Sequence, residues 1–149
     1  MIQLPLRIAK QHQRLGRTQF AALPWRDAAD GIEICLVTSR GRGRWILPKG
    51  WPMDRTTPAE AAAIEAREEA GLLGQPEDRC LGIWTYTKSG IPHFAMVFPL
   101  QVTRTLDDWP ERAERRRKWF TPARAAAKLD APELRQMVLG LVSGMAAPG

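Results

Sequence analysis

Three glutamates in the middle of the chain have the residue type and the spacing to hold a divalent cation. Glu65, Glu68 and Glu69 stand three and four positions apart, and at roughly 100° per residue they share one face of a helix. Like charges at these spacings repel one another unless solvent or a cation offsets them. Carboxylate oxygens suit Mg²⁺ or Mn²⁺, and Mg²⁺ completes its shell with water and substrate phosphate oxygens. A Glu-rich face is also typical of a solvated surface helix, so geometry alone leaves both interpretations open.

The sequence around these glutamates predicts the helix that must position them. Thr57 is a candidate N-cap, followed by Pro58 at the first helical position and by Glu60 at the capping-box spacing. An alanine-rich run of high helix propensity comes next, and Gly71 stands where a left-handed C-cap glycine belongs. We therefore expect a helix over residues 58–70 that carries all three glutamates.

Runs of apolar and β-branched residues on both sides of this helix predict strands. The expected strands cover Thr18 to Trp25, Ile32 to Ser39, Trp45 to Leu47, Cys80 to Thr87, His93 to Val102 and Lys118 to Phe120. Lys88 to Gly90 predicts the turn of a hairpin, and a final helix fits Pro132 to Met145. Strands before, between and after helices indicate an α/β domain in which helices cover a sheet.

Length, charge and cysteine content limit the class of protein and of partner. The chain has 149 residues, with 22 Lys and Arg against 16 Asp and Glu and a net charge of +6. This length suits one domain, which we place at residues 18–149 behind a basic N-terminal arm at residues 1–17. The start lacks the apolar centre of a secretory signal, no stretch is long and apolar enough for a membrane span, and two cysteines are too few for a disulfide framework. We therefore expect a cytoplasmic protein with an anionic partner such as nucleic acid, polyphosphate or a phosphorylated metabolite.

The spacing of the glutamates resembles the box of the Nudix hydrolases, G-x5-E-x7-R-E-U-x-E-E-x-G-U, in which U is a bulky aliphatic residue. The matching positions, without insertion or deletion, are Gly50, Glu65, Glu68, Glu69, Gly71 and Leu72. The departing positions are Thr56 at the first Glu, Ile64 at the Arg and Ala66 at the bulky aliphatic. The resemblance implies a Nudix-type α/β/α sandwich with a mixed β-sheet, in which Glu65, Glu68 and Glu69 bind the metal. The changes at Thr56 and Ile64 delete one acid and one base together, which leaves the orientation of the loop against the helix open.

A second resemblance narrows the family. Several short segments resemble the diphosphoinositol polyphosphate phosphohydrolase branch of the family, which also takes diadenosine polyphosphates. These segments are Thr38-Ser39-Arg40, Arg44-Trp45-Ile46-Leu47-Pro48, Leu106-Asp107-Asp108-Trp109 and Arg117-Lys118-Trp119-Phe120. Ligands of this branch carry dense phosphate, which arginine binds bidentately and lysine binds as a point charge. The residues that we expect to bind substrate lie in and near the box: Arg40, Arg42, Arg44, Lys49, Gly50, Trp51, Arg115 and Arg117.

The expected activity is metal-dependent hydrolysis of a phosphoanhydride bond. Glu65, Glu68 and Glu69 would hold Mg²⁺ or Mn²⁺, with Glu68 as the expected base and Glu65 as the second catalytic carboxylate. Loop carboxylates are alternative bases whose more common role is surface charge: Asp107, Asp108, Glu111 and Glu114.

Two other functions fit the same sequence. One is a nucleotide-sugar or ADP-ribose pyrophosphatase on the same fold, and the other is a non-catalytic domain that binds nucleotides or RNA. Clustered cations in the arm support RNA binding, but no RNA-binding motif with interleaved aromatic residues is present, and metal-free acids would repel nucleic acid. We therefore expect a small-molecule polyphosphate substrate, with neither nucleic acid nor a membrane as partner. Nothing in the sequence demands a protein partner.

Overall fold

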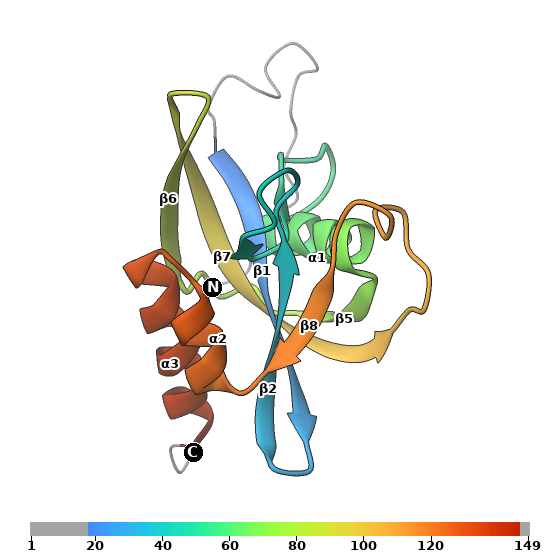
Figure 1. Ribbon diagram of the computed structural model, residues 1–149, viewed down its shortest axis with the longest axis vertical. Coiled ribbons are helices and arrows are strands. Elements are labelled where there is room, and N and C mark those ends of the chain that lie inside the picture. The colour runs from blue at the N-terminus through green and yellow to red at the C-terminus, as the bar shows by residue number, and fades with distance from the viewer. Residues whose placement is uncertain (1–17, 147–149) are drawn as a thin grey trace.

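One mixed β-sheet forms the framework of the protein, and the computed structural model describes it within residues 18–146 (Figure 1). The arm expected at residues 1–17 lies outside the described residues, as do residues 147–149. The strands are β1 (Thr18–Ala28), β2 (Gly31–Thr38), β3 (Trp45–Ile46), β4 (Lys49–Gly50), β5 (Leu72–Pro76), β6 (Gly82–Lys88), β7 (Ile91–Thr105) and β8 (Arg117–Phe120). The sheet order is β3-β2-β1-β7-β5, with β4 on β1, β6 on β7 and β8 on β2. β1 and β7 run parallel at the centre, and the neighbouring pairs β1–β2 and β5–β7 are antiparallel.

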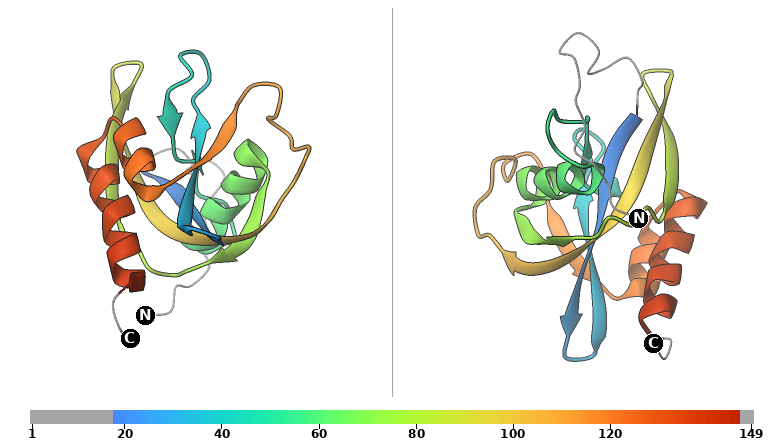
Figure 2. Two further views of the ribbon diagram at one scale, coloured as in Figure 1. Left: turned by 60° about the horizontal axis from the view of Figure 1, so that its bottom comes forward. Right: turned by 180° about the vertical axis from the view of Figure 1, so that it is seen from behind.

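Helices cover both faces of this sheet, which confirms the expected α/β/α sandwich (Figure 2). α1 (Pro58–Ala70) packs on β1, β5 and β7, whereas α2 (Pro122–Lys128) packs on β2 and β8, and α3 (Pro132–Ala146) packs on α2 and β6. Alternate residues of β1 therefore enter separate cores, with Leu23 on the side of α2 and α3 and Phe20 on the side of α1. None of the helices within residues 18–146 is long and apolar enough to cross a membrane.

The expected capping box forms at the start of α1. The Thr57 hydroxyl accepts a hydrogen bond from the Glu60 amide at 3.1 Å, and the Glu60 carboxylate accepts one from the Thr57 amide at 3.3 Å. Gly71 ends the helix with a φ of 64°, a left-handed conformation that glycine adopts without steric cost. Between these caps, α1 buries short side chains against the sheet: Ala59, Ala61, Ala62, Ala66 and Ala70. Because alanine is short, the helix backbone lies close to the sheet and brings its acids next to β4.

β4, β5 and α2 do not follow from the sequence patterns, and the two residues of β4 lie outside the expected strands. β5 comes directly after the C-cap of α1 and contains Gly74 and Pro76, which are residue types that weaken or end strands. The structure accommodates them because β5 pairs with β7 alone among the described strands and its register shifts after Leu73. α2 has seven residues, too few to show a helical period, although its Thr121-Pro122 start repeats the N-cap signal of α1.

Replacing Thr57 with alanine should lower the free energy of unfolding by about 1 kcal/mol, because the Glu60 amide loses its acceptor in the first turn of α1. Urea unfolding followed by circular dichroism measures the change. Thr57→Ser is the matched control, since serine keeps the hydroxyl and should retain most of the stability. Equal losses in both variants would assign the effect to the methyl group of Thr57 and not to the cap.

Candidate active site

The three glutamates of α1 lie in different environments. Glu69 is the deepest, with 6% of its surface exposed, whereas Glu65 and Glu68 are half-buried. The Lys49 amide donates to Glu69 Oε1 at 3.3 Å, so β4 holds this carboxylate against the sheet. Gly50, the next residue of β4, lies directly against the carboxyl group of Glu65, where a Cβ atom would overlap it. The glycine that the sequence placed among the substrate-binding residues therefore leaves room for a site glutamate.

Burial raises the pKa of two of these acids. It raises the pKa of Glu69 to about 7, and the cations of Arg115 and Lys49 offset only part of this shift. Burial also raises the pKa of Glu65 to about 7, and the charges of Glu69 and Glu111 add to the shift. Carboxylates that are buried, close together and incompletely neutralised favour the arrival of a cation.

The segment between β7 and β8, residues 106–116, is fastened to the C-terminal part of α1. The indole Nε1 of Trp109 donates to the backbone carbonyl of Glu69 at 3.0 Å. The backbone amide of Glu111 donates to the carbonyl of Glu68 at 3.2 Å. These bonds satisfy carbonyls near the helix end and carry a loop carboxylate into the site.

That carboxylate, Glu111, is the residue whose place in the site sequence reasoning underestimated. Its charge raises the pKa of both Glu65 and Glu69, and Arg115 pairs with Glu111 as well as with Glu69. Two arginines hold it, since Arg115 Nε and Arg40 Nη2 each donate to Glu111 Oε1 at 2.8 Å. The i,i+4 spacing of Glu111 and Arg115 is a sequence signal for their pairing, but its position beside α1 depends on the tertiary structure.

The other loop carboxylates lie at the surface. Asp107 and Asp108 are exposed, and Glu114 is an exposed residue whose carboxylate accepts a hydrogen bond from Arg40 Nη2 at 2.7 Å. Arg40 therefore braces the loop through two glutamates, and its positive charge is already shared with them.

The donors of this site suit a hard divalent cation, although they are not gathered around one point. Among residues 18–146 no group of three His, Cys, Asp or Glu side chains is arranged to hold a metal ion. Glu65, Glu68 and Glu69 nevertheless offer only oxygen donors, which Mg²⁺ and Mn²⁺ prefer. The raised pKa values of Glu65 and Glu69 show that the neighbouring cations leave their charge partly uncompensated. A divalent ion fits this donor set and would have to draw the side chains together.

A cleft of about 590 Å³ opens beside the acids, and half of the residues that line it are cations. The basic residues that line it are Arg40, Arg42, Arg44, Lys49, Lys88 and Arg115. Two of them connect the cleft to the acids, because the Lys49 amide and the Arg115 guanidinium both contact the Glu69 carboxylate. Five of these cations were predicted from the sequence. The sixth, Lys88, was not predicted; it lies in the hairpin that joins β6 to β7.

Aromatic rings form another part of the cleft wall, and Lys49 covers them. Its ammonium group lies 4.9 Å from the centre of the Tyr86 ring and 5.5 Å from that of Trp84. Burial lowers the pKa of this ammonium. Tyr86 stacks on His93 at 5.3 Å, and Trp51 lies 5.9 Å from His93. Trp51, which we expected at the substrate, thus belongs to an aromatic row behind Tyr86 and is not among the residues that line the cleft.

Arg117 and two of the three altered box positions, Thr56 and Ile64, lie outside the basic cleft. Arg117 Nη1 donates to the last carbonyl of α1 at 2.8 Å, and its guanidinium lies 4.1 Å above the Trp109 ring, outside the basic cleft. Thr56 Oγ1 donates to the carbonyl of Met53 at 2.7 Å, and Ile64 is exposed on α1. A local hydroxyl bond therefore shapes the loop at the position where the Nudix box has its first glutamate.

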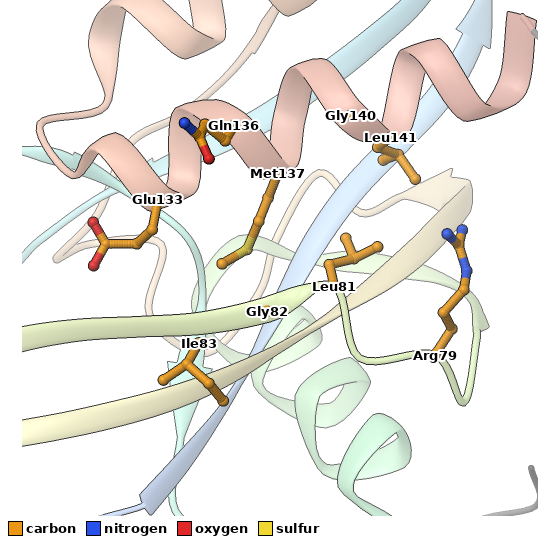
Figure 3. A pocket seen from close by; sticks show the side chains of 9 residues that line it. All are labelled: Arg79, Leu81, Gly82, Ile83, Glu133, Gln136, Met137, Gly140 and Leu141. Carbon is orange, nitrogen blue, oxygen red and sulfur yellow. The ribbon is translucent and has the colours of Figure 1, made fainter.

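A second cavity, of about 410 Å³, lies between β6 and α3 (Figure 3). Leu81, Ile83 and Met137 contribute apolar side chains to it. Its one lining carboxylate, Glu133, already accepts hydrogen bonds from the amide and the hydroxyl of Thr85 at 3.3 and 3.2 Å. This lining has neither the paired acids nor the row of cations found beside α1.

Comparison with known proteins places this geometry in a family. The NUDIX domain profile matches residues 17–141. The chain is 36% identical to "Nudix hydrolase 17, mitochondrial" of Arabidopsis thaliana, over 86% of this chain and 78% of that protein. It is 38% identical to "Nudix hydrolase 12, mitochondrial" of the same plant, over 64% of this chain, and spans about half (51%) of that protein. Since these relatives are named mitochondrial, the cytoplasmic location expected from the sequence stays a prediction.

Two further matches concern named enzymes. The chain is 34% identical to diphosphoinositol polyphosphate phosphohydrolase 3-alpha of Mus musculus, over 67% of this chain and 61% of that protein. The crystal structure of a C. elegans Ap4A hydrolase binary complex superposes with a TM-score of 0.71 at 21% identity, over 87% of this chain and 97% of that one. The second match shows a shared fold.

The raised pKa values predict how stability changes with pH. Because Glu65 and Glu69 have a pKa of about 7 in the folded protein against 4.5 ordinarily, the folded state binds more protons than the unfolded chain between these values. Stability should therefore fall as the pH rises through this window and level off above it. In a chelating buffer, the free energy of unfolding of Glu69→Gln should fall over this window by on the order of 2 kcal/mol less than that of the wild type, because glutamine does not ionise.

Urea unfolding between pH 5 and pH 8 measures this effect. Glu77→Gln is the control, because Glu77 is a surface residue paired with Arg79 outside the site. It should follow the wild-type profile. A Glu69→Gln profile parallel to that of the wild type would contradict the assignment.

Proposed function

The chain belongs to the Nudix hydrolase family, and from this premise we propose that it hydrolyses phosphoanhydride bonds in a densely phosphorylated small molecule. Glu65, Glu68 and Glu69 would hold the Mg²⁺ or Mn²⁺ that this reaction requires. The favoured substrate is a diphosphoinositol polyphosphate, and a diadenosine polyphosphate is the second member of the class. The observation that carries the proposal is the row of six cations along the cleft beside the acids.

Several of these cations are available to a ligand. Arg42, Arg44 and Lys88 make no ion pair with any residue between 18 and 146. A guanidinium binds phosphate through two parallel hydrogen bonds, and an ammonium binds it as a point charge. The open cations therefore suit a ligand with several adjacent phosphates, whereas Arg40 serves to brace Glu111 and Glu114.

The aromatic part of the cleft favours recognition by charge over recognition of a base. A nucleobase that stacks on a protein needs an open ring face. Trp84 is 5% exposed, and the Lys49 ammonium lies over the rings of both Trp84 and Tyr86. This arrangement supports a diphosphoinositol polyphosphate in preference to diadenosine polyphosphates, nucleotide sugars or ADP-ribose. The name of the mouse relative supports the same choice.

The residues of the site have separate tasks in this reaction. A bound divalent ion would polarise a phosphate oxygen and lower the pKa of the attacking water. Glu69, fixed by the Lys49 amide, and Glu65, seated against Gly50, would bind that ion. Glu68 would accept the proton, with its backbone held by the loop through the Glu111 amide. The cations of the cleft orient the phosphates and offset the charge that develops on the leaving group.

A panel of substrates tests the proposal. Diphosphoinositol pentakisphosphate, diadenosine hexaphosphate and ADP-ribose are each incubated with Mg²⁺ and with a chelator, and the products are separated. We expect Mg²⁺-dependent release of phosphate, with kcat/KM at least about tenfold higher for the diphosphoinositol substrate than for the two nucleotides. Binding of these compounds without turnover would favour the non-catalytic alternative, and preferred cleavage of ADP-ribose would favour the pyrophosphatase.

Glu68→Gln should lower kcat on the favoured substrate by about 100-fold or more, because the amide cannot accept a proton from water. The thermal midpoint should change little, since the Glu68 side chain is half-buried and the backbone bond from Glu111 remains. Glu77→Gln serves again as the surface control. Undiminished turnover of Glu68→Gln would remove this residue from the catalytic group.

A further inference from the structure

Arg115 lies between the acids of α1 and the loop that covers them. Its side chain is 10% exposed. Nε donates to Glu111 Oε1 at 2.8 Å, Nη1 donates to the backbone carbonyl of Thr38 at 3.0 Å, and Nη2 lies 3.6 Å from Glu69 Oε2. Within residues 18–146, it is the one cation that pairs with both an α1 glutamate and a loop glutamate. A largely buried guanidinium thus bridges an acid of α1 and an acid of the loop.

At this position, Arg115 and a divalent ion would compete for the same carboxylate oxygens. Two cations near the same carboxylate oxygens repel each other, and the repulsion is stronger in a partly buried site than in water. The α1 acids are also not gathered around a common point, while Glu69 is directed to Arg115 and to the Lys49 amide. A metal ion at Glu69 would therefore compete with Arg115 for this carboxylate.

The three contacts of Arg115 differ in strength, and this determines which one breaks. The bonds of Nε to Glu111 and of Nη1 to the Thr38 carbonyl are short hydrogen bonds, whereas the contact with Glu69 is the longest of the three. The side chain can lose Glu69 and remain anchored at its other two partners. Arg115 also lines the basic cleft, so the Nη2 group that is released would remain available to a phosphate bound there.

We propose that Arg115 is a built-in counterion that pairs with Glu69 until a divalent cation binds, and that the cation then releases its Nη2 group to the phosphates in the cleft. This inference rests on the proposed function, because it takes the α1 glutamates as the metal ligands. Arg115 then binds phosphate directly and couples the two ligands, so that each one favours the binding of the other.

Calorimetric titration of the full chain with Mn²⁺, without phosphate compounds, tests the competition. The titration is run at pH 8.5, above the pKa of about 7 of Glu65 and Glu69, so that protons do not compete. Arg115→Gln should bind Mn²⁺ at least about fivefold more tightly than the wild type, because the competing charge is gone. Arg115→Lys, which keeps the charge, should stay closer to the wild type.

Arg112→Gln is the matched control. Arg112 lies in the same loop, but its guanidinium is exposed and pairs at 3.8 Å with Asp108. Its removal should change the Mn²⁺ affinity by less than about twofold, since exposed charges are screened by solvent. An equal gain in Mn²⁺ affinity in Arg115→Gln and Arg112→Gln would overturn the inference, because the gain would then come from the lower net charge of the loop and not from the contact with Glu69.

The substrate gives a readout that structural damage would not produce. In Arg115→Gln the KM for the phosphorylated substrate should rise by at least about threefold while Mn²⁺ binds more tightly, because one phosphate donor is lost. Unchanged or weaker Mn²⁺ binding by this variant would overturn the inference and leave the proposed function intact. If the wild type binds no Mn²⁺, both fail.

The wild-type protein allows a measurement that needs no variant. The Nε–H resonance of Arg115 can be followed by NMR while Mg²⁺ is added. It should shift along with the titration, because the guanidinium changes partner. A resonance that does not move while Mg²⁺ binds would overturn the inference, even where Arg115→Gln fails to fold.

Discussion

The burial of like-charged carboxylates on α1 is the constraint to which the rest of the site is fitted. A buried carboxylate without a partner costs several kcal/mol, and α1 is drawn close to the sheet by its row of alanines. The structure offsets this cost from three directions. Gly50 leaves space for the Glu65 carboxyl group, the Lys49 amide donates to Glu69, and Arg115 supplies a cation from the loop. The pKa values of Glu65 and Glu69 remain raised, so the compensation is incomplete and a further cation is favoured.

Features encoded in short stretches of sequence were predictable, and contacts between distant segments were not. α1 begins and ends where Thr57, Pro58 and Gly71 predicted, because capping depends on neighbouring residues. The main strands and α3 also follow their apolar runs. By contrast, Glu111 joins the site from more than 40 residues away, through a loop fixed by Trp109. No periodic pattern contains that information.

Arginines show the same distinction most clearly. Composition and spacing identify which residues are cationic, but an arginine beside a site can bind a ligand, a carboxylate or a helix terminus with the same group. Arg117 donates to the last carbonyl of α1 and Arg40 braces two loop glutamates, whereas Arg42 lines the cleft. The altered box position at Thr56 is a related case, because a hydroxyl bond to Met53 shapes the loop whose orientation the sequence left open.

The net charge of +6 is therefore a poor measure of how strongly the cleft attracts an anion. Of the cations along its wall, Arg40 is paired with Glu111 and Glu114, and Arg115 is paired with Glu69 and with the same Glu111. The Lys49 ammonium lies over two aromatic rings, and burial lowers its pKa. The field that meets an incoming phosphate comes first from Arg42, Arg44 and Lys88 at the outer wall. If the cleft binds a polyphosphate as proposed, the phosphates that reach further in would meet Arg40 and Arg115, which are already paired with acids. The charge of these arginines would become available only as the acids acquire another counterion, so that binding of the anion there would depend on the occupancy of the acids.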